Sequence, residues 1–110
     1  MFENDPSVLY FSVHRYEQGQ YFPSHQDGAP HAAGAGAGKG TTVNVGWNTR
    51  GHTRPGDAEY LTVWREILLP IGREFDPDLV IIAAGFDAAE GDPLGGCARA
   101  GHVVVVAVST

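Results

Sequence analysis

The sequence has 110 residues, enough for one small domain with a modest core. Its 7 basic and 13 acidic side chains give a net charge of −6, which excludes a nucleic-acid binder that relies on clustered Lys and Arg. A single cysteine excludes an internal disulfide framework and a multi-cysteine zinc finger. The longest apolar runs, 79–84 and 103–108, are too short to span a bilayer, and the acidic start differs from a signal peptide. We therefore expect a soluble intracellular α/β protein with no membrane association.

The first half of the sequence predicts two strands separated by a long loop. Residues 8–13 are rich in β-formers and apolar on both sides, which is typical of a strand inside a sheet. Residues 41–47 alternate well enough to form a second strand. Residues 17–40, dominated by Gly, Ala, Gln, His and Pro, show no sustained period. A loop of that length inside a compact domain is usually functional or disordered.

The second half predicts a helix between two strands. Asp57 stands at an N-cap position, and apolar residues then recur with helical spacing, although Pro70 predicts a kink or an early break. Residues 79–84 are continuously apolar, as in a parallel strand covered on both faces, and 102–110 form another β-prone run. The order of strand, helix and strand suggests a right-handed βαβ unit. The helical stripe consists of Tyr60, Trp64, Ile67, Leu68, Ile71 and Phe75.

Asp87 is the strongest candidate for function on physical grounds. It follows the most apolar predicted strand, at the sheet edge where open α/β folds bind ligands. A carboxylate there is costly to desolvate unless it is paired, hydrogen-bonded or bound to a metal. The alternative is that Asp87 caps the loop that follows, and its position alone leaves both interpretations open.

Other polar and aromatic residues near this edge have weaker claims to a site. His14 ends the first strand, where a satisfied structural histidine is the favoured interpretation. His25 and His31 have finger-like spacing without a cysteine pair, which favours solvated surface side chains. The neighbours Tyr21 and Phe22 either pack onto the core or line a substrate channel, and the pattern does not decide between these alternatives.

A series of motifs runs in one order from about Met1 to Cys97. The longest, residues 84–96, reads Ala-Gly-Phe-Asp-Ala-Ala-Glu-Gly-Asp-Pro-Leu-Gly-Gly. The others are residues 5–10, 12–19, 21–23, 42–45, 56–61 and 68–71. In this combination the sequence resembles the zinc-dependent histone deacetylases, most of all class II enzymes of the cytoplasmic tubulin-deacetylase type.

The resemblance implies roles for four residues. Asp87 matches one of three zinc ligands, the other two being an Asp and a His from an earlier segment of the family sequence. Phe22 matches an aromatic residue that lines the tunnel for the acetyl-lysine side chain. Ser12 and Val13 match positions whose backbone oxygens help to hold a structural potassium ion. No catalytic residue is expected in this sequence, because the family's paired histidines and its transition-state tyrosine would lie before and after it.

The resemblance also implies a fold and an activity. Residues 1–97 are expected to form part of a histone deacetylase catalytic domain, an open parallel sheet flanked by helices as in the arginase-like fold, with residues 98–110 as a divergent tail. The implied function is that of a fragment of a lysine deacetylase, a zinc hydrolase and chromatin regulator that removes acetyl groups from N6-acetyl-lysine in histones or tubulin. Zinc would polarise the amide carbonyl and activate water. The expected location is cytoplasm, nucleus or both, without direct nucleic-acid binding.

Two alternatives remain open at this point. A small-molecule deacetylase that acts on acetylated polyamines would share the fold and similar motifs. A truncated isoform that binds partners without chemistry is the non-enzymatic alternative. We expect the isolated chain to be inactive in either case, because it contains one zinc ligand.

Overall fold

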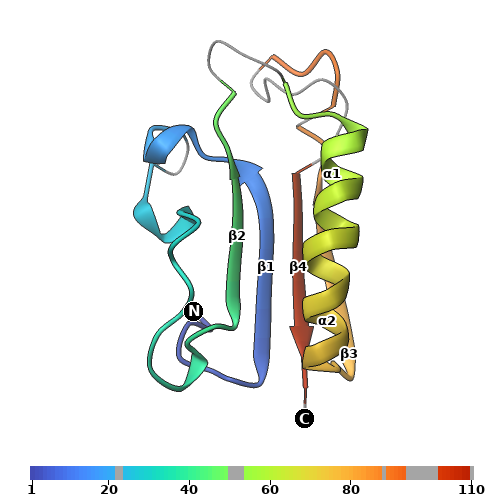
Figure 1. Cartoon of the computed structure of the whole chain (residues 1–110). Helices are drawn as coiled ribbons and strands as arrows, with labels where there is room; N and C mark the ends of the chain where they lie inside the picture. The colour runs from blue at the N-terminus through green and yellow to red at the C-terminus, as the bar shows by residue number, and fades with distance from the viewer. Residues whose placement is uncertain (22–23, 50–53, 88, 94–101, 110) are drawn as a thin grey trace.

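One mixed sheet of four strands forms the centre of the molecule (Figure 1). The computed structural model describes residues 1–21, 24–49, 54–87, 89–93 and 102–109. The strands are β1 (Val8–Arg15), β2 (Thr42–Trp47), β3 (Leu79–Gly85) and β4 (His102–Val108), in the spatial order β2-β1-β4-β3. β1 pairs in parallel with β2, and β4 pairs antiparallel with both β1 and β3. The predicted α/β class is confirmed.

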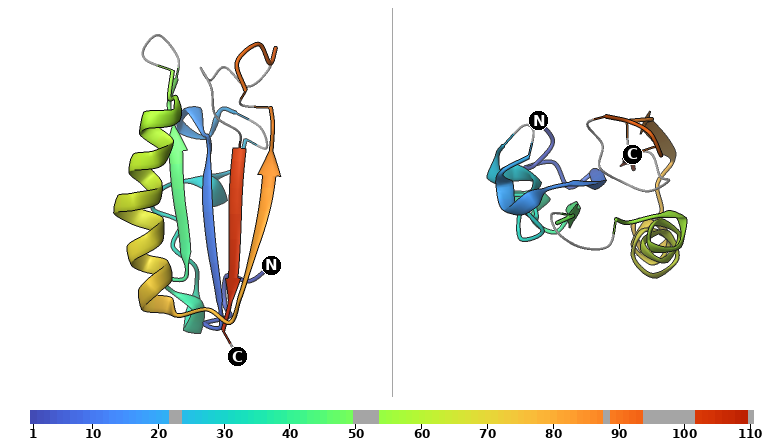
Figure 2. Two further views of the ribbon diagram at one scale, coloured as in Figure 1. Left: turned by 90° about the vertical axis from the view of Figure 1, so that its right-hand side faces the viewer. Right: turned by 90° about the horizontal axis from the view of Figure 1, so that it is seen from above.

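A single helical rod covers one face of the sheet, and the long loop covers part of the other (Figure 2). The rod consists of α1 (Asp57–Val63), a π-helical turn η4 (Trp64–Leu68) and α2 (Leu69–Phe75). Within the described residues, no helix is long and apolar enough to cross a membrane.

The central strand β1 is buried on both sides, as its sequence predicts. Phe11 and Val13 are 1% and 0% exposed and pack in the core with helix residues. Ser12 and His14 lie on the opposite face, toward the loop. Because side chains alternate along a strand, β1 presents an apolar row to the helix and a polar row to the loop. The core cluster consists of Phe11, Val13, Tyr60, Val63, Leu68 and Val105.

The helix follows its predicted stripe but differs from the prediction at its start and at its proline. The N-cap is Gly56 rather than Asp57, and the Glu59 carboxylate accepts a hydrogen bond from the Gly56 N–H at 2.8 Å. Pro70 neither breaks the rod nor ends it. The π-helical turn ends two residues before Pro70, and there the Leu69 N–H bonds to the Trp64 carbonyl. This wider turn accommodates a residue that has no N–H to donate.

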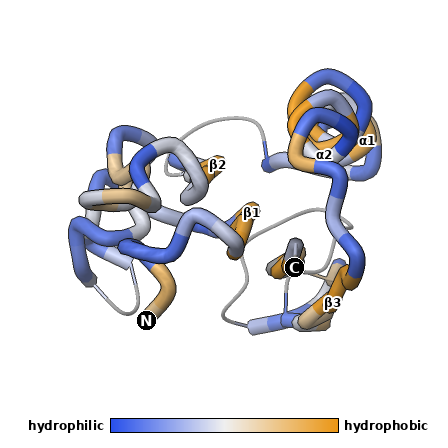
Figure 3. Tube along the Cα trace, turned by 90° about the horizontal axis from the view of Figure 1, so that it is seen from below, coloured by the Kyte–Doolittle hydropathy of each residue, from blue (hydrophilic) through white to orange (hydrophobic). Residues whose placement is uncertain are grey.

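The two C-terminal strands differ from the sequence prediction in their neighbours. β3 was expected to be covered on both faces, yet this hydrophobic strand lies at the sheet edge (Figure 3). Its apolar side chains are about half exposed. β4 lies between β3 and β1, so β3 has no parallel partner, although it runs in the same direction as β1 and β2. The residues of β3 are apolar on both faces of the strand, and this pattern does not specify which strand lies beside it. The exposed side chains are Leu79, Val80, Ile81 and Ile82.

Burial along the helix predicts a matched pair of variants. Leu68 is 7% exposed and belongs to the core cluster, whereas Leu61 is 51% exposed on the same rod. Leu68→Ala should lower the free energy of unfolding by about 2–5 kcal/mol because it leaves a cavity. Leu61→Ala should change it by about 0.5 kcal/mol or less. Urea unfolding of both variants measures the difference, and equal losses would contradict this packing.

The start of the helix predicts a dependence on pH. The hydrogen bond from the Gly56 N–H lowers the pKa of the Glu59 carboxyl below its ordinary value of 4.5. A carboxyl with a lowered pKa in the folded state stabilises the fold above its unfolded pKa, and this contribution is lost as the pH falls through the folded pKa. Glu59→Gln should therefore be less stable than the wild type near neutral pH, and the gap should close as the pH falls below 4.5 and through the lowered pKa of Glu59. Glu66→Gln, on the exposed side of the rod, is the control; urea unfolding that shows the same trend for both would refute the assignment.

Candidate functional site at the carboxyl edge of the sheet

Three strands end at the same edge of the sheet. β1 and β2 are parallel, and β3 shares their direction because β4 is antiparallel to both β1 and β3. Their carboxyl ends therefore meet at the upper end of the molecule in Figure 1. Asp87 lies two residues after β3 and is exposed. Asp87 lies at the edge that also ends β1, as predicted, but it follows an edge strand and not a central parallel strand. This is the edge where α/β sheets bind ligands.

His14 is fully hydrogen-bonded. Its Nε2 lies 2.8 Å from the Gly28 carbonyl oxygen, and its Nδ1 lies 2.8 Å from the Ser12 hydroxyl. Because a carbonyl only accepts, Nε2 carries the proton in the neutral ring, and Nδ1 then accepts from Ser12. The interpretation of His14 as a satisfied structural histidine is confirmed.

The same polar row anchors the long loop. The buried Asn44 side chain on β2 donates to the carbonyl oxygens of Asp27 and Ala32, both at 3.1 Å. Together with the bond from His14 to Gly28, these contacts fix residues 27–32 against the sheet, and Ala29 is 0% exposed. The loop is therefore an ordered layer in its described part.

An open cavity of about 710 Å³ lies between this loop and the sheet. His25 lies on its wall, largely exposed, with its Nδ1 2.9 Å from an Asp27 carboxylate oxygen, which agrees with a surface position. His31 is also exposed. The polar residues that line the cavity include Ser12, His14, His25, Asp27 and Asn44.

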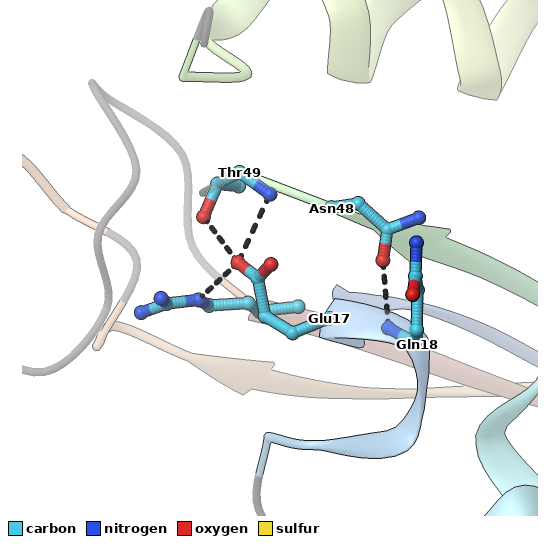
Figure 4. Close-up of polar contacts among 5 residues, drawn as sticks. Glu17, Gln18, Asn48 and Thr49 are labelled. Carbon is cyan, nitrogen blue, oxygen red and sulfur yellow. Dashed lines mark hydrogen bonds and ion pairs between the residues drawn. The ribbon is translucent and has the colours of Figure 1, made fainter. Parts of the chain in front are cut away.

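The segment after β1 contains a buried acidic residue that the sequence did not single out. Glu17 Oε1 accepts hydrogen bonds from the Thr49 N–H at 2.9 Å and the Thr49 hydroxyl at 2.6 Å (Figure 4). Arg15 Nε lies 2.9 Å from the same oxygen. Glu17 and Gln18 have φ angles of 51° and 57°, a left-handed conformation that costs roughly 1–2 kcal/mol per non-glycine residue. We name this arrangement of Arg15, Glu17 and Thr49 the carboxylate latch.

The residues implied by the resemblance are placed as follows. Ser12 and Val13 lie on the central strand with β2 on one side and β4 on the other, and both are buried. Their potassium role stays a prediction. Asp87 is exposed at the sheet edge, and within the described residues no three His, Cys, Asp or Glu side chains gather as a metal site. Phe22 lies outside the described residues.

Comparison with known proteins identifies the class to which this sheet and its edge belong. The histone deacetylase domain profile matches residues 1–105. Histone deacetylase 5 of Arabidopsis thaliana is 52% identical over 97 residues, covering 88% of this chain and 14% of the relative. Polyamine deacetylase HDAC10 of Homo sapiens is 50% identical over 95 residues, covering 86% of this chain and 14% of the relative.

Solved structures agree with this match. The histone deacetylase Clr3 superposes with a TM-score of 0.83 at 43% identity, covering 89% of this chain and 16% of that chain. The HDA15 HD domain superposes with a TM-score of 0.81 at 46% identity, covering 89% of this chain and 26% of that chain. The chain belongs to the histone deacetylase family. It spans 14% of the length of the Arabidopsis and HDAC10 relatives.

The anchoring of the loop by Asn44 generates a test of this site. Asn44→Ala removes two hydrogen bonds from a buried amide and should lower the free energy of unfolding by about 1–3 kcal/mol. It should also speed proteolytic cleavage within residues 25–33, because the loop would open locally. Asn4→Ala, at an exposed position, is the control and should change neither quantity. Similar cleavage rates for the two variants would show that Asn44 does not hold the loop.

Proposed function

We propose that this chain is a segment of a zinc-dependent, class II protein lysine deacetylase that hydrolyses N6-acetyl-lysine in histones or in other proteins such as tubulin. The observation that carries the proposal is the family match over residues 1–105, which includes Asp87 at the carboxyl edge of the sheet. The homologues named above are deacetylases of histones or polyamines. Acetylated proteins are accordingly the proposed partners.

Zinc requires more than this segment supplies. A catalytic zinc usually has three protein ligands and one open position. Asp87 is one candidate ligand, and the described part of the chain gathers no three suitable side chains. The proposal therefore needs two further ligands from elsewhere in a complete domain, where zinc would act as a Lewis acid toward the amide carbonyl. We propose that the 110-residue chain alone does not catalyse the reaction.

The polyamine alternative is kept because of the name that a relative bears. HDAC10, at 50% identity, bears the name polyamine deacetylase. Acetyl-lysine peptides and acetylpolyamines share the amide to be cleaved, so the segment can serve either substrate. The choice of substrate therefore belongs in the activity test.

The test uses a graft in which residues 1–97 replace the matching segment of the Clr3 deacetylase domain, to which this chain is 43% identical. The graft should cleave an acetyl-lysine peptide, and Asp87→Asn should lower both its zinc content and its rate, the rate by about 100-fold or more. Asp76→Asn, an exposed aspartate at the end of α2, is the matched control and should keep both.

The outcomes separate the candidates. Cleavage of acetylpolyamine with little cleavage of the peptide would favour the second candidate. A folded graft that cleaves neither substrate, or an Asp87→Asn graft with full activity, would refute the proposal. Turnover by the 110-residue chain alone would refute its proposed inactivity.

A further inference from the structure

Glu17 is a buried acidic residue on a strained segment of backbone. Its side chain is 3% exposed, although it lies at the end of a strand in a polar segment. A buried carboxylate is costly unless hydrogen bonds and opposite charge compensate it. Here one oxygen receives two hydrogen bonds from Thr49 and an ion pair from Arg15 (Figure 4). These three contacts to the carboxylate come from two residues at the carboxyl edge, Arg15 and Thr49.

These contacts join the segments that leave two parallel strands. Arg15 is the last residue of β1, and Thr49 follows the end of β2 by two residues. A second cross-link lies beside the latch, where the Gln18 N–H donates to Asn48 Oδ1 at 2.8 Å. The Tyr16 N–H also bonds to the Trp47 carbonyl at 2.8 Å. The two segments thus remain tied together beyond the point where the sheet pairing ends.

The backbone held by these contacts is in a disfavoured conformation. Glu17, Gln18 and Gly19 follow one another with φ angles of 51°, 57° and 83°. Non-glycine residues keep such angles only where the surrounding structure imposes them. Because the strained residue and the buried carboxylate are the same residue, loss of the carboxylate removes one of the contacts that hold this turn in its strained conformation.

The latch also orients the next aromatic residue. The guanidinium carbon of Arg15 lies 4.4 Å from the centroid of the Tyr21 ring, within the range of a cation–π contact. The Tyr21 N–H bonds to the Tyr16 carbonyl at 3.3 Å. Glu17 therefore fixes Arg15, and Arg15 lies over the residue that directly precedes Phe22.

We propose that Glu17 is a positioning residue for substrate binding: through the carboxylate latch it holds residues 16–21, the segment that directly precedes Phe22 in the sequence. This inference rests on the proposed function, because Phe22 has a substrate only in a deacetylase. Glu17 acts on the position of that segment and takes no part in the reaction itself. Loss of the latch should weaken substrate binding while the zinc site and the chemical step stay intact.

The test measures KM and kcat separately in the graft of residues 1–97 into the Clr3 domain. Glu17→Ala should raise KM for the peptide about tenfold, equivalent to about 1.4 kcal/mol of binding. The value of kcat should change less than about threefold, because a contact made equally in the ground state and the transition state affects KM alone. Glu17→Gln keeps an acceptor for Thr49 but loses the charge that pairs with Arg15. Its KM should therefore lie between the values for the unsubstituted graft and for Glu17→Ala. Glu66→Gln, an exposed glutamate, is the control and should match the unsubstituted graft.

The zinc content and the melting temperature are measured for each variant. If the unsubstituted graft is active and Glu17→Ala lowers its melting temperature without changing KM, Glu17 has a purely structural role. That result would overturn this inference and leave the proposed function standing. An unsubstituted graft that folds but cleaves neither substrate overturns the proposed function, and this inference with it.

Amide hydrogen exchange of the 110-residue chain gives a second measurement that needs no activity. Glu17→Ala should increase exchange at residues 16–21 and 48–49 more than in the sheet core, and Glu66→Ala should not. Equal changes across the chain, or none at the edge, would show that Glu17 does not hold this segment.

Discussion

The alternation of side chains along β1 is the constraint on which the rest of the structure depends. Phe11 and Val13 point to the helix and are almost fully buried. Ser12 and His14, on the other face, hold the long loop through hydrogen bonds. A shift of register by one residue would exchange the two rows, placing polar groups in the core and apolar groups against the loop. The parallel pairing with β2 and the position of the helix follow from this one strand.

The sequence predicted those features that a single segment determines. The stripe from Tyr60 to Phe75 predicted the helix, and the apolar run at 8–13 predicted an interior strand; both are confirmed. The neighbours of β3 could not be predicted, because its continuous apolar pattern is compatible with any sheet position. The response to Pro70 depended on whether the preceding turn could widen, which is a property of the backbone and has no marker in the side-chain pattern.

The candidate site likewise contains one residue that the sequence predicted, Asp87, and one that it did not, Glu17. The sequence predicted that Asp87 ends a strand at the carboxyl edge, as the structure has it, but that strand is an edge strand without a parallel neighbour. Glu17 was missed because its partner Thr49 is 32 residues away and follows another strand. One signal was present in the sequence: Arg15 and Glu17 bracket the end of a predicted strand, where an opposite-charge pair can be buried together. That pair alone does not say whether it faces solvent, so burial had to come from the structure.

The shape of this segment and its chemistry have different physical origins. The pairing of β1 with β2, the helix stripe and the carboxylate latch are contacts within the chain, and the fold superposes on a deacetylase structure at a TM-score of 0.83 with 43% identity. Asp87, in contrast, is exposed, and an exposed carboxylate contributes little to the stability of the fold. β4 separates β1 from β3, so two strand spacings, about 10 Å, lie between the latch side of the edge and the strand that ends before Asp87. The carboxylate latch therefore holds the β1 and β2 side of this edge, and Asp87 follows the strand at the far side of it.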